Sequence, residues 1–387
     1  MGERKNQACL SADERAAFVA AVLELKRRGA FDVFVDQHRT AMCVRDPDPA
    51  HRGPSFLPWH REYLRRFEFA LQQINPTVTL PYWDWTADRS ETTSLWVPEF
   101  MGGDGDGANG RVTTGSFAFA TGNWPLNIRD PGETAPFLKR AFGIAEANLP
   151  TVRHVRDALA VVPYDAAPWD VRAQPSFRNR LEGWYGPGIH NQVHLWVGGT
   201  MLGCSSPNDP VFWLHHCNID RLWARWQADH PEQGYLPSSG AAQGHNLNDP
   251  MWPWTGEAAP PTPATVLDHT ALGYSYDTDS ILNEVVRAEG RVALLRAHDK
   301  GTKYGPRGDR LDVEVVIRLD TQSGKAFGFQ LRDDTNESAH GGMLDSLRDA
   351  FNREQRIQID YVRSGSCQGR ILRVWKLPQR RREPTYA

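Results

Sequence analysis

The sequence predicts a mainly α-helical body followed by a small α+β module that is rich in strands. In the first part of the chain, apolar residues recur at helical spacing. After about residue 280 they alternate with polar residues at the period of a strand. The length of 387 residues suits one large domain plus a smaller one, so we place the domain boundaries at 1–280 and 281–387.

Two segments of the body have the pattern of amphipathic helices. One helix face is formed by Phe31, Phe34, Val35 and His38. A second face with the same spacing is formed by His60, Leu64, Phe67, Leu71 and Ile74. Each of these faces includes a histidine, and a polar ring on an apolar face needs a partner, either a backbone carbonyl or a metal.

The last third of the chain has the residue pattern of strands in place of the helical pattern of the body. A proline-rich run at residues 257–263 predicts a linker. Beyond it, alternating residues predict strands over 311–319, 327–331 and 357–361, with a last strand over 370–375. A short helix is indicated by Leu344, Leu347 and Phe351. The basic run at 380–382 is interpreted as a solvated tail. This module is the predicted β-rich C-terminal domain.

Composition excludes several classes of protein. A net charge of −3 gives no sign of nucleic-acid binding or of docking on an anionic membrane. No window offers the roughly 20 apolar residues that a membrane-spanning helix needs. The start of the chain is polar and shows no export signal. The five scattered cysteines predict reduced thiols. We therefore expect a cytoplasmic protein, with export alongside a signal-bearing partner left open.

Seven of the 13 histidines lie in two clusters, which are His38, His51 and His60, and His190, His194, His215 and His216. Neutral imidazoles offer lone pairs to a metal, although any one such residue is more often satisfied in the core. Imidazole-only sites suit zinc, copper, iron or nickel. A single zinc would use only three of these side chains, and no glutamate is placed for zinc hydrolysis. Two facing copper sites make better use of the set.

Asp220 lies four residues after His216, on the same face of a predicted helix. A carboxylate there could accept the second N–H of the imidazole and fix its tautomer. The alternative is a surface ion pair with Arg221 or Arg225.

Several motifs resemble the tyrosinase family of type-3 copper proteins, and its short bacterial members in particular. They are residues 52–61 (RGPSFLPWHR), 80–85 (LPYWDW) and 208–216 (NDPVFWLHH), within a likeness that covers about 3–276. The resemblance implies a four-helix bundle that holds two copper ions, with O2 as co-substrate. It assigns His38, His51 and His60 to copper A, and His190, His194 and His216 to copper B. His215 is then a neighbour of a ligand.

The resemblance also implies roles around the metals. Glu182 and Asn191 match a pair proposed to hold a water that takes the proton of a phenol, whose pKa is ordinarily near 10. Phe56 would form an apolar wall beside copper A, and Leu195 would tune substrate access. Pro49 stands where fungal and plant members carry a cysteine linked to a histidine, so no thioether is expected.

The function so implied is oxidation of a small phenolic substrate, by ortho-hydroxylation of monophenols, oxidation of o-diphenols, or both. Glu182 and Asn191 favour the ortho-hydroxylation of monophenols. The alternative is an o-aminophenol or catechol oxidase of secondary metabolism that does not hydroxylate monophenols. An oxygen carrier and a silent copper protein are rivals that turnover of a catechol would exclude. A copper chaperone resembling the caddie proteins is an expected partner. The C-terminal domain is either a lid, with Tyr304 as plug, or an independent module.

Overall fold

The computed structural model describes residues 2–186, 188–279, 286–299, 313–322, 324–331, 337–365 and 368–378. It divides into two compact units, Met1–Tyr276 and Asp277–Ala387, which we treat separately. Tyr304 and the basic run at 380–382 lie outside the described residues. The proline-rich run at 257–263 is not a linker, because it packs inside the first unit. Pro261 accepts a hydrogen bond from the Met251 N–H at 2.9 Å, and Glu257 pairs with Arg66.

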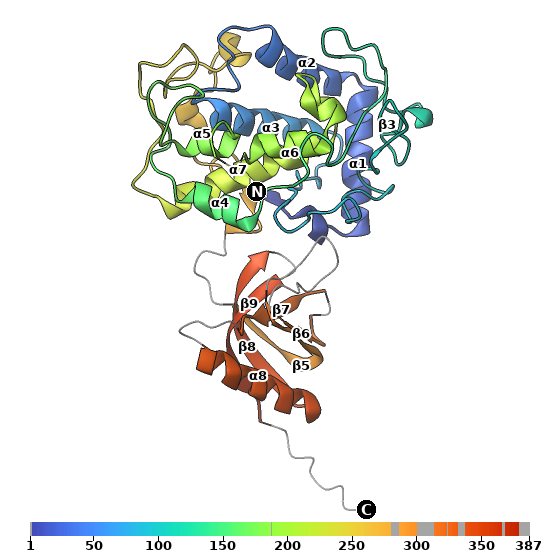
Figure 1. The fold of residues 1–387 in the computed structure, drawn as a ribbon, viewed down its shortest axis with the longest axis vertical. Coiled ribbons are helices and arrows are strands. Elements are labelled where there is room, and N and C mark those ends of the chain that lie inside the picture. Colours follow the sequence, from blue (N-terminus) through green and yellow to red (C-terminus); the bar gives the residue numbers. More distant parts are fainter. Residues whose placement is uncertain are drawn as a thin grey trace, which may run out of the picture. The chain divides into compact units, whose positions relative to one another are not determined.

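Helices dominate the first unit, with long loops between them (Figure 1). They are α1 (Ala12–Arg27), α2 (Ala30–Cys43), α3 (Phe56–Gln72), α4 (Val152–Leu159), α5 (Phe177–Glu182), α6 (His190–Val197) and α7 (Val211–Asp229). Both helices indicated by the apolar faces of the sequence are present as α2 and α3. Ser11 caps α1 through a reciprocal box with Glu14. Gly29, at φ 74°, makes the sharp turn into α2.

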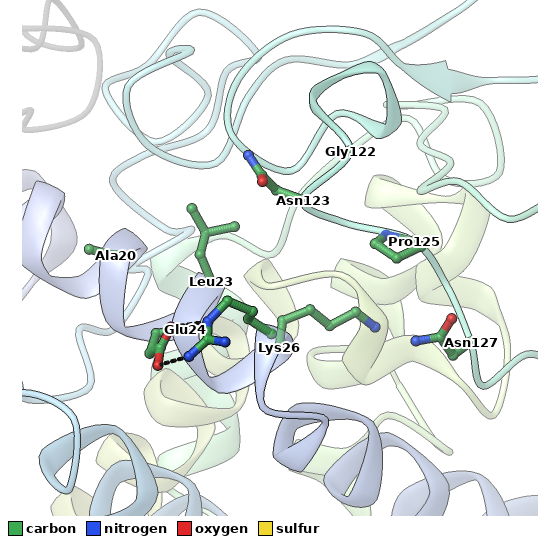
Figure 2. A pocket seen from close by; sticks show the side chains of 9 residues that line it. Ala20, Leu23, Glu24, Lys26, Gly122, Asn123, Pro125 and Asn127 are labelled. Carbon is green, nitrogen blue, oxygen red and sulfur yellow. Dashed lines mark hydrogen bonds and ion pairs between the residues drawn. The ribbon is translucent and has the colours of Figure 1, made fainter.

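A polar groove lies between α1 and residues 122–127 (Figure 2). Its charged side chains are engaged with one another or with neighbours. Arg27 donates to Glu24 at 2.6 Å, and Lys26 pairs with Asp32. None of the described residues that line this groove is a histidine. It therefore offers no arrangement for the metal that the sequence indicates.

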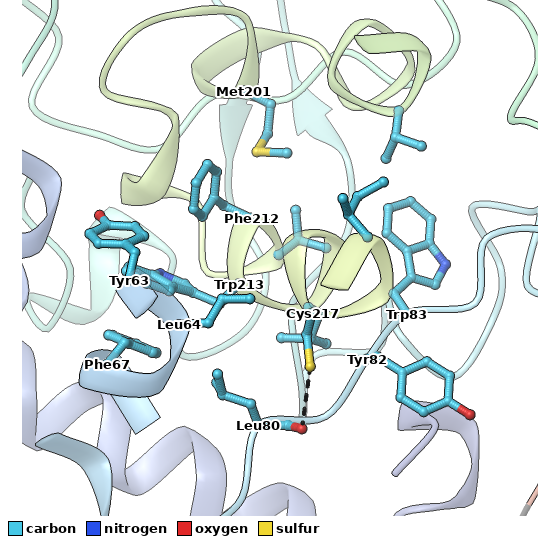
Figure 3. Packing of buried hydrophobic residues seen from close by; sticks show 14 of the residues in the cluster. Tyr63, Leu64, Phe67, Leu80, Tyr82, Trp83, Met201, Phe212, Trp213 and Cys217 are labelled. Carbon is cyan, nitrogen blue, oxygen red and sulfur yellow. Dashed lines mark hydrogen bonds between the residues drawn. The ribbon is translucent and has the colours of Figure 1, made fainter. Parts of the chain in front are cut away.

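The core of the first unit is built where α3 packs on α7 (Figure 3). The ring of Phe67 on α3 stacks on Trp213 of α7, with centroids 3.5 Å apart. Tyr63, one turn earlier on α3, stacks on the same Trp213 ring, with centroids 4.9 Å apart. Such aromatic packing fixes the rotation of both helices about their axes. The same packing therefore orients His60 and His216, which lie on other faces of α3 and α7.

Short strands complete the first unit. Near the ends of this unit, β1 (Gly2–Arg4) pairs in parallel with β4 (Tyr274–Tyr276). Two strands of two residues each, β2 (Gly105–Asp106) and β3 (Arg111–Val112), pair in antiparallel fashion. The β1–β4 pair brings Arg4 next to residues from the other end of the unit, which matters for Asp220 below.

The second unit is a closed barrel in the order β5-β6-β7-β9-β8, with one helix packed on it. Its elements are β5 (Val286–Ala297), β6 (Val315–Leu319), β7 (Ala326–Phe329), α8 (Glu337–Asn352), β8 (Arg356–Gly365) and β9 (Gln368–Lys376). The core holds the alternating residues read from the sequence, including Ile317, Phe327 and Ile359. Strand β5 was not predicted, because its inward positions include Ala288 and Gly290, which give almost no hydrophobic signal. Among the described residues, no helix is long and apolar enough to cross a membrane.

Candidate metal centre

The first histidine group comes from two helices and the loop between them. His38 lies on α2, His60 begins the second turn of α3, and His51 stands on the connecting loop. Their ring centroids are 4.9 Å apart for His38 and His51, 4.9 Å for His51 and His60, and 5.9 Å for His38 and His60. All three side chains are buried, and one nitrogen of each lies within 4.8 Å of the others. This spacing can hold one metal ion.

The second group comes from α6 and α7. His190 and His194 sit one turn apart on α6, as their spacing predicts, and His216 faces them from α7. The Nε2 atom of His216 lies 3.2 Å from Nε2 of His190 and 3.4 Å from Nε2 of His194. The ring of His60 stacks on that of His216 with centroids 4.3 Å apart, so the two groups face each other.

The protonation of these rings is set by acceptors at their outer nitrogens. Nδ1 of His38 lies 2.7 Å from the carbonyl oxygen of Cys204, that of His60 lies 2.8 Å from Phe56 O, and that of His194 lies 2.7 Å from Met201 O. A carbonyl only accepts, so each Nδ1 carries the proton and each Nε2 carries a lone pair. His51 Nδ1 meets the carboxylate of Asp48 at 3.3 Å. His190 Nδ1 meets Asn191 Oδ1 at 2.9 Å.

Burial keeps the rings neutral. Desolvation, followed by the neighbouring imidazoles, lowers the pKa of His38, His60, His190 and His216 well below the ordinary 6.5. Burial lowers the pKa of His194 to about 4. Within the described residues, Nε2 of His38 and Nε2 of His60 are buried and have no hydrogen-bond partner. Converging lone pairs without a donor between them fit a bound metal and little else.

His215 differs from its neighbours in this respect. Trp85 Nε1–H donates to its Nδ1 at 3.2 Å, and an indole has only a proton to offer. The neutral ring of His215 therefore carries its own proton on Nε2, although one of its two ring nitrogens lies within 4.8 Å of nitrogens of the second group. In this tautomer His215 has no lone pair for a metal, which agrees with its interpretation as a neighbour of a ligand.

The orienting role expected for Asp220 is wrong. Asp220 accepts from Arg61 Nε at 2.5 Å, from the Tyr274 hydroxyl at 2.7 Å and from the Tyr276 hydroxyl at 2.5 Å, with Arg4 at 3.3 Å. The hydrogen bonds of the Asp220 carboxylate therefore all go to this buried network and none goes to His216. Nδ1 of His216 has no hydrogen-bond partner within the described part of the chain. The surface pairs with Arg221 or Arg225 are not formed either, since those arginines bond Asn218 and Asp229.

The prediction of reduced thiols is also wrong at one place. Cys43 and Cys204 form a disulfide across 161 residues of sequence, with Cα atoms 6.0 Å apart. The bond ties the end of α2 to the segment whose Cys204 carbonyl holds His38. Cys217 forms no disulfide within the described part of the chain, and burial raises its pKa to about 12, which keeps the thiol unreactive.

Glu182 and Asn191 lie at the same cavity. Glu182 is buried, and its two oxygens accept from the Arg52 backbone N–H at 2.6 Å and from Arg178 Nη1 at 2.9 Å. Asn191 directs its Oδ1 to the His190 ring, as above. Phe56 is edge-on to both His60 and His190, at 4.9 Å from each, so it walls off both histidine groups and not the first alone.

A cavity of about 250 Å³ opens onto these histidines. Leu195 and Trp184, each 41% exposed, stand among its lining residues. The other lining residues are His38, Met42, His51, Arg52, Glu182, His190, Asn191, His194, Met201, Leu202, Gly203 and Ser206. Arg52, Trp184 and the Met201 carbonyl were not singled out from the sequence. Arg52 and Trp184 lie on loops and Met201 on a four-residue 3-10 helix, segments that carry no periodic signal.

Comparison with known proteins agrees with this geometry. The common central domain of tyrosinase matches residues 28–229. A tyrosinase of Streptomyces glaucescens is 53% identical over 283 residues, covering 72% of this chain and 100% of the relative. Grixazone synthase of Streptomyces griseus is 43% identical over 307 residues, covering 71% of this chain and 98% of the relative. A solved polyphenol oxidase of Thermothelomyces thermophila is 27% identical with a TM-score of 0.53, covering 71% and 88%.

A helical fold around two imidazole groups defines a dinuclear metal oxidase as the class of protein. The chain belongs to the tyrosinase family. It is accordingly a copper-dependent phenol oxidase that uses two copper ions and O2. The donor set fits this metal, because neutral imidazole nitrogens suit copper and, among the described residues, neither histidine group includes a thiolate or a carboxylate.

Proposed function

We propose that the protein hydroxylates small monophenols at the ortho position and oxidises o-diphenols to o-quinones. The observation that carries this proposal is the pair of converging Nε2 groups beside one small cavity. We assign copper A to His38, His51 and His60, and copper B to His190, His194 and His216. The helices α2, α3, α6 and α7 carry five of these residues, and we propose that they act as the four-helix bundle that holds the metals.

When bound, the two copper ions supply the electron transfer between phenol and O2. The chain holds the metals in position, excludes water from the site and accepts the proton of the phenol. Six imidazoles held through their Nδ1 atoms or by burial keep the metals at fixed places. Phe56 keeps water from the space between the two histidine groups.

A monophenol must lose its proton before it binds the metal as phenolate. We propose that Glu182 and Asn191 hold the water that accepts this proton. Support comes from their placement on one cavity wall beside His190. The Arg178 guanidinium donates a buried hydrogen bond to one Glu182 oxygen at 2.9 Å, which fixes the carboxylate in place beside the cavity.

The alternative is oxidation of o-aminophenols or catechols without monophenol hydroxylation. Its support is the 43% identity to a protein named grixazone synthase. Leu195 at the cavity mouth is then the residue that sets which substrates enter.

Oxygen uptake separates the two functions. Copper-loaded protein would be given a monophenol such as tyrosine, a catechol and an o-aminophenol. Uptake with all of them establishes hydroxylation. Uptake with only the last two establishes the alternative, and no uptake with any of them contradicts both.

For the C-terminal domain, which we place at 281–387, we propose a lid role toward the copper cavity, with Tyr304 as the candidate plug. An independent module is the competing function. A chain ending near Tyr276 would test this, since the tyrosinase of Streptomyces glaucescens aligns over its whole length with 72% of this chain. Faster turnover of the truncated chain supports a lid, and unchanged turnover and copper loading contradict it.

We also propose a cytoplasmic location and loading by a caddie-like copper chaperone, with export alongside a partner as the alternative. The Cys217 thiol, which is not part of a disulfide, is typical of a reducing compartment, whereas the Cys43–Cys204 disulfide is typical of an oxidising one. Fractionation of the producing cells decides between them. Copper uptake by purified metal-free protein from a buffered copper solution tests whether a chaperone is needed.

A further inference from the structure

Among the six proposed copper ligands, His51 alone lies outside a helix. The other five sit on α2, α3, α6 and α7, whereas His51 stands on the irregular segment between Cys43 and Phe56. A side chain on a helix is held more precisely than one on a loop, because loop backbone is more mobile. The position of His51 therefore depends on the contacts that hold this loop.

The group that orients the His51 ring belongs to the same loop. Nδ1 of His51 lies 3.3 Å from the Asp48 carboxylate. The same carboxylate accepts the backbone N–H of Ala50 at 2.9 Å and that of His51 at 3.0 Å. Residues 48–51 thus form a turn that is bonded within itself and can shift as one piece. Its place relative to the other ligands must be fixed by residues outside the loop.

His245 bridges the two ends of the segment 48–55 from a distant part of the chain. Its Nε2 lies 3.1 Å from the Asp48 carbonyl oxygen, and its Nδ1 lies 2.8 Å from the Ser55 hydroxyl. Burial lowers the pKa of His245 to about 4, which keeps the ring neutral. Because a carbonyl only accepts, Nε2 carries the proton and Nδ1 offers its lone pair to Ser55. The ring also lies against Gly53, where an added Cβ would come within 2.7 Å of it.

His245 is itself held from the side away from the loop. The Tyr235 hydroxyl donates to the His245 carbonyl at 2.6 Å, and the His245 N–H donates to the Ala242 carbonyl at 3.1 Å. The whole residue is buried. A buried ring with a fixed backbone can therefore fix the segment to which it bonds.

We propose that His245 is a positioning residue for copper A, which fixes the segment 48–55 so that Nε2 of His51 meets the nitrogens of the other two ligands. This proposal rests on the proposed assignment of His51 to copper A. Groups that orient a metal ligand through hydrogen bonds are typically worth about 10- to 100-fold in metal affinity. Since His245 bonds to the loop of one histidine group only, its loss should weaken one copper site and leave the other unchanged.

The test is a titration of metal-free full-length protein with Cu(I) against a competing chelator, in two chains that each keep one site. His194→Ala removes a ligand of copper B, and His51→Ala removes a ligand of copper A. In the His194→Ala chain, His245→Phe is expected to weaken the remaining site about tenfold. In the His51→Ala chain, the same change is expected to leave the affinity unchanged. Equal losses in both chains, or no loss in either, would overturn the proposal.

Three further variants keep the test specific. Gly53→Ala drives a Cβ into the His245 ring and is expected to give the same selective loss without changing the histidine. His245→Asn keeps an acceptor near the place of Nδ1 and is expected to fall between the wild type and His245→Phe. The control is His230→Phe, which removes a histidine that bonds the Leu159 carbonyl at 2.8 Å at the end of α7. A loss at copper A in this control equal to that in His245→Phe would contradict the proposal.

Hydrogen exchange in the absence of metal separates the proposal from the ligand assignment. In metal-free His245→Phe, the amides of residues 48–55 are expected to exchange faster than in the wild type, with α6 unchanged, and equal exchange would contradict a positioning role. If His51→Ala still binds two copper ions, the assignment of His51 fails, and the proposal fails with it. If His51→Ala binds one ion while His245→Phe binds two with wild-type affinities, the positioning role alone is refuted.

Discussion

Replacing Asp220 by asparagine tests whether its carboxylate serves the fold or a copper ligand. Asp220 lies on α7, four residues after His216, but its oxygens contact Arg61, Arg4 and two tyrosine hydroxyls. All of these partners are buried. Asp220→Asn keeps the size of the side chain and removes its charge, which leaves Arg61 without its carboxylate.

The expected cost follows from that burial. Removing one partner of a buried ion pair costs about 3–5 kcal/mol, since the remaining charge stays desolvated. Glu68 still compensates Arg4 at 2.7 Å, so the lower end, about 3 kcal/mol, is expected. Burial alone would raise the pKa of Asp220, but Arg61, Arg4 and the tyrosine hydrogen bonds outweigh it and hold the pKa below its ordinary value.

The stabilisation by Asp220 is therefore fully present above the unfolded pKa of about 3.9 and is lost as the pH falls through the lower folded pKa. The assay is urea unfolding of the metal-free full chain, followed by tryptophan fluorescence, since Arg61 stacks on Trp223 at 3.7 Å. Asp229→Asn, which breaks an exposed pair with Arg225 on the same helix, is the control and should cost under about 0.5 kcal/mol. Equal midpoints for the two variants, or a loss of copper affinity without a loss of stability, would refute the reasoning.

Three further results are expected. Replacing Cys43 and Cys204 by serine should lower the free energy of unfolding by about 2–5 kcal/mol, because the disulfide closes a loop of 161 residues, and unchanged urea midpoints would argue against the bond. His245 bonds Ser55 at 2.8 Å, and burial lowers its pKa to about 4. Its contribution is full above about pH 6.5 and is lost toward pH 4, by about 3 kcal/mol, so stability curves of wild type and His245→Gln should converge as the pH falls. Glu182→Gln should slow monophenol oxygenation about 100-fold and diphenol oxidation much less, and equal losses in oxygen uptake would contradict its proton role.

The two histidine clusters could be predicted from the sequence because spacing along the chain indicates them. His190 and His194 are one helical turn apart, and His38 and His60 stand on apolar faces that had to be buried. What fixes their tautomers was not accessible. The carbonyl of Cys204, which faces His38, is 166 residues away in the sequence. A backbone oxygen also has no residue type to signal it.

Long-range polar partners explain the two errors at the site. Asp220 has the spacing of an orienting carboxylate, but Arg4 reaches it from 216 residues away through the β1–β4 pairing. Cys43 and Cys204 look like scattered thiols until α2 is packed. In the second unit, strands with large alternating residues were predicted, whereas β5 was missed because alanine and glycine fill its inward positions. Contacts between residues far apart in the sequence determine the partners of Asp220, the disulfide and strand β5, and local spacing does not reveal such contacts.

Anomalous diffraction at the copper edge, from crystals of copper-loaded protein, tests the central claim most directly. We predict two copper peaks, one bound by Nε2 of His38, His51 and His60 and the other by Nε2 of His190, His194 and His216. His215 should keep its hydrogen bond from Trp85 and bind neither ion. A single peak, or a copper ion bound by His215 in place of His216, would contradict the account.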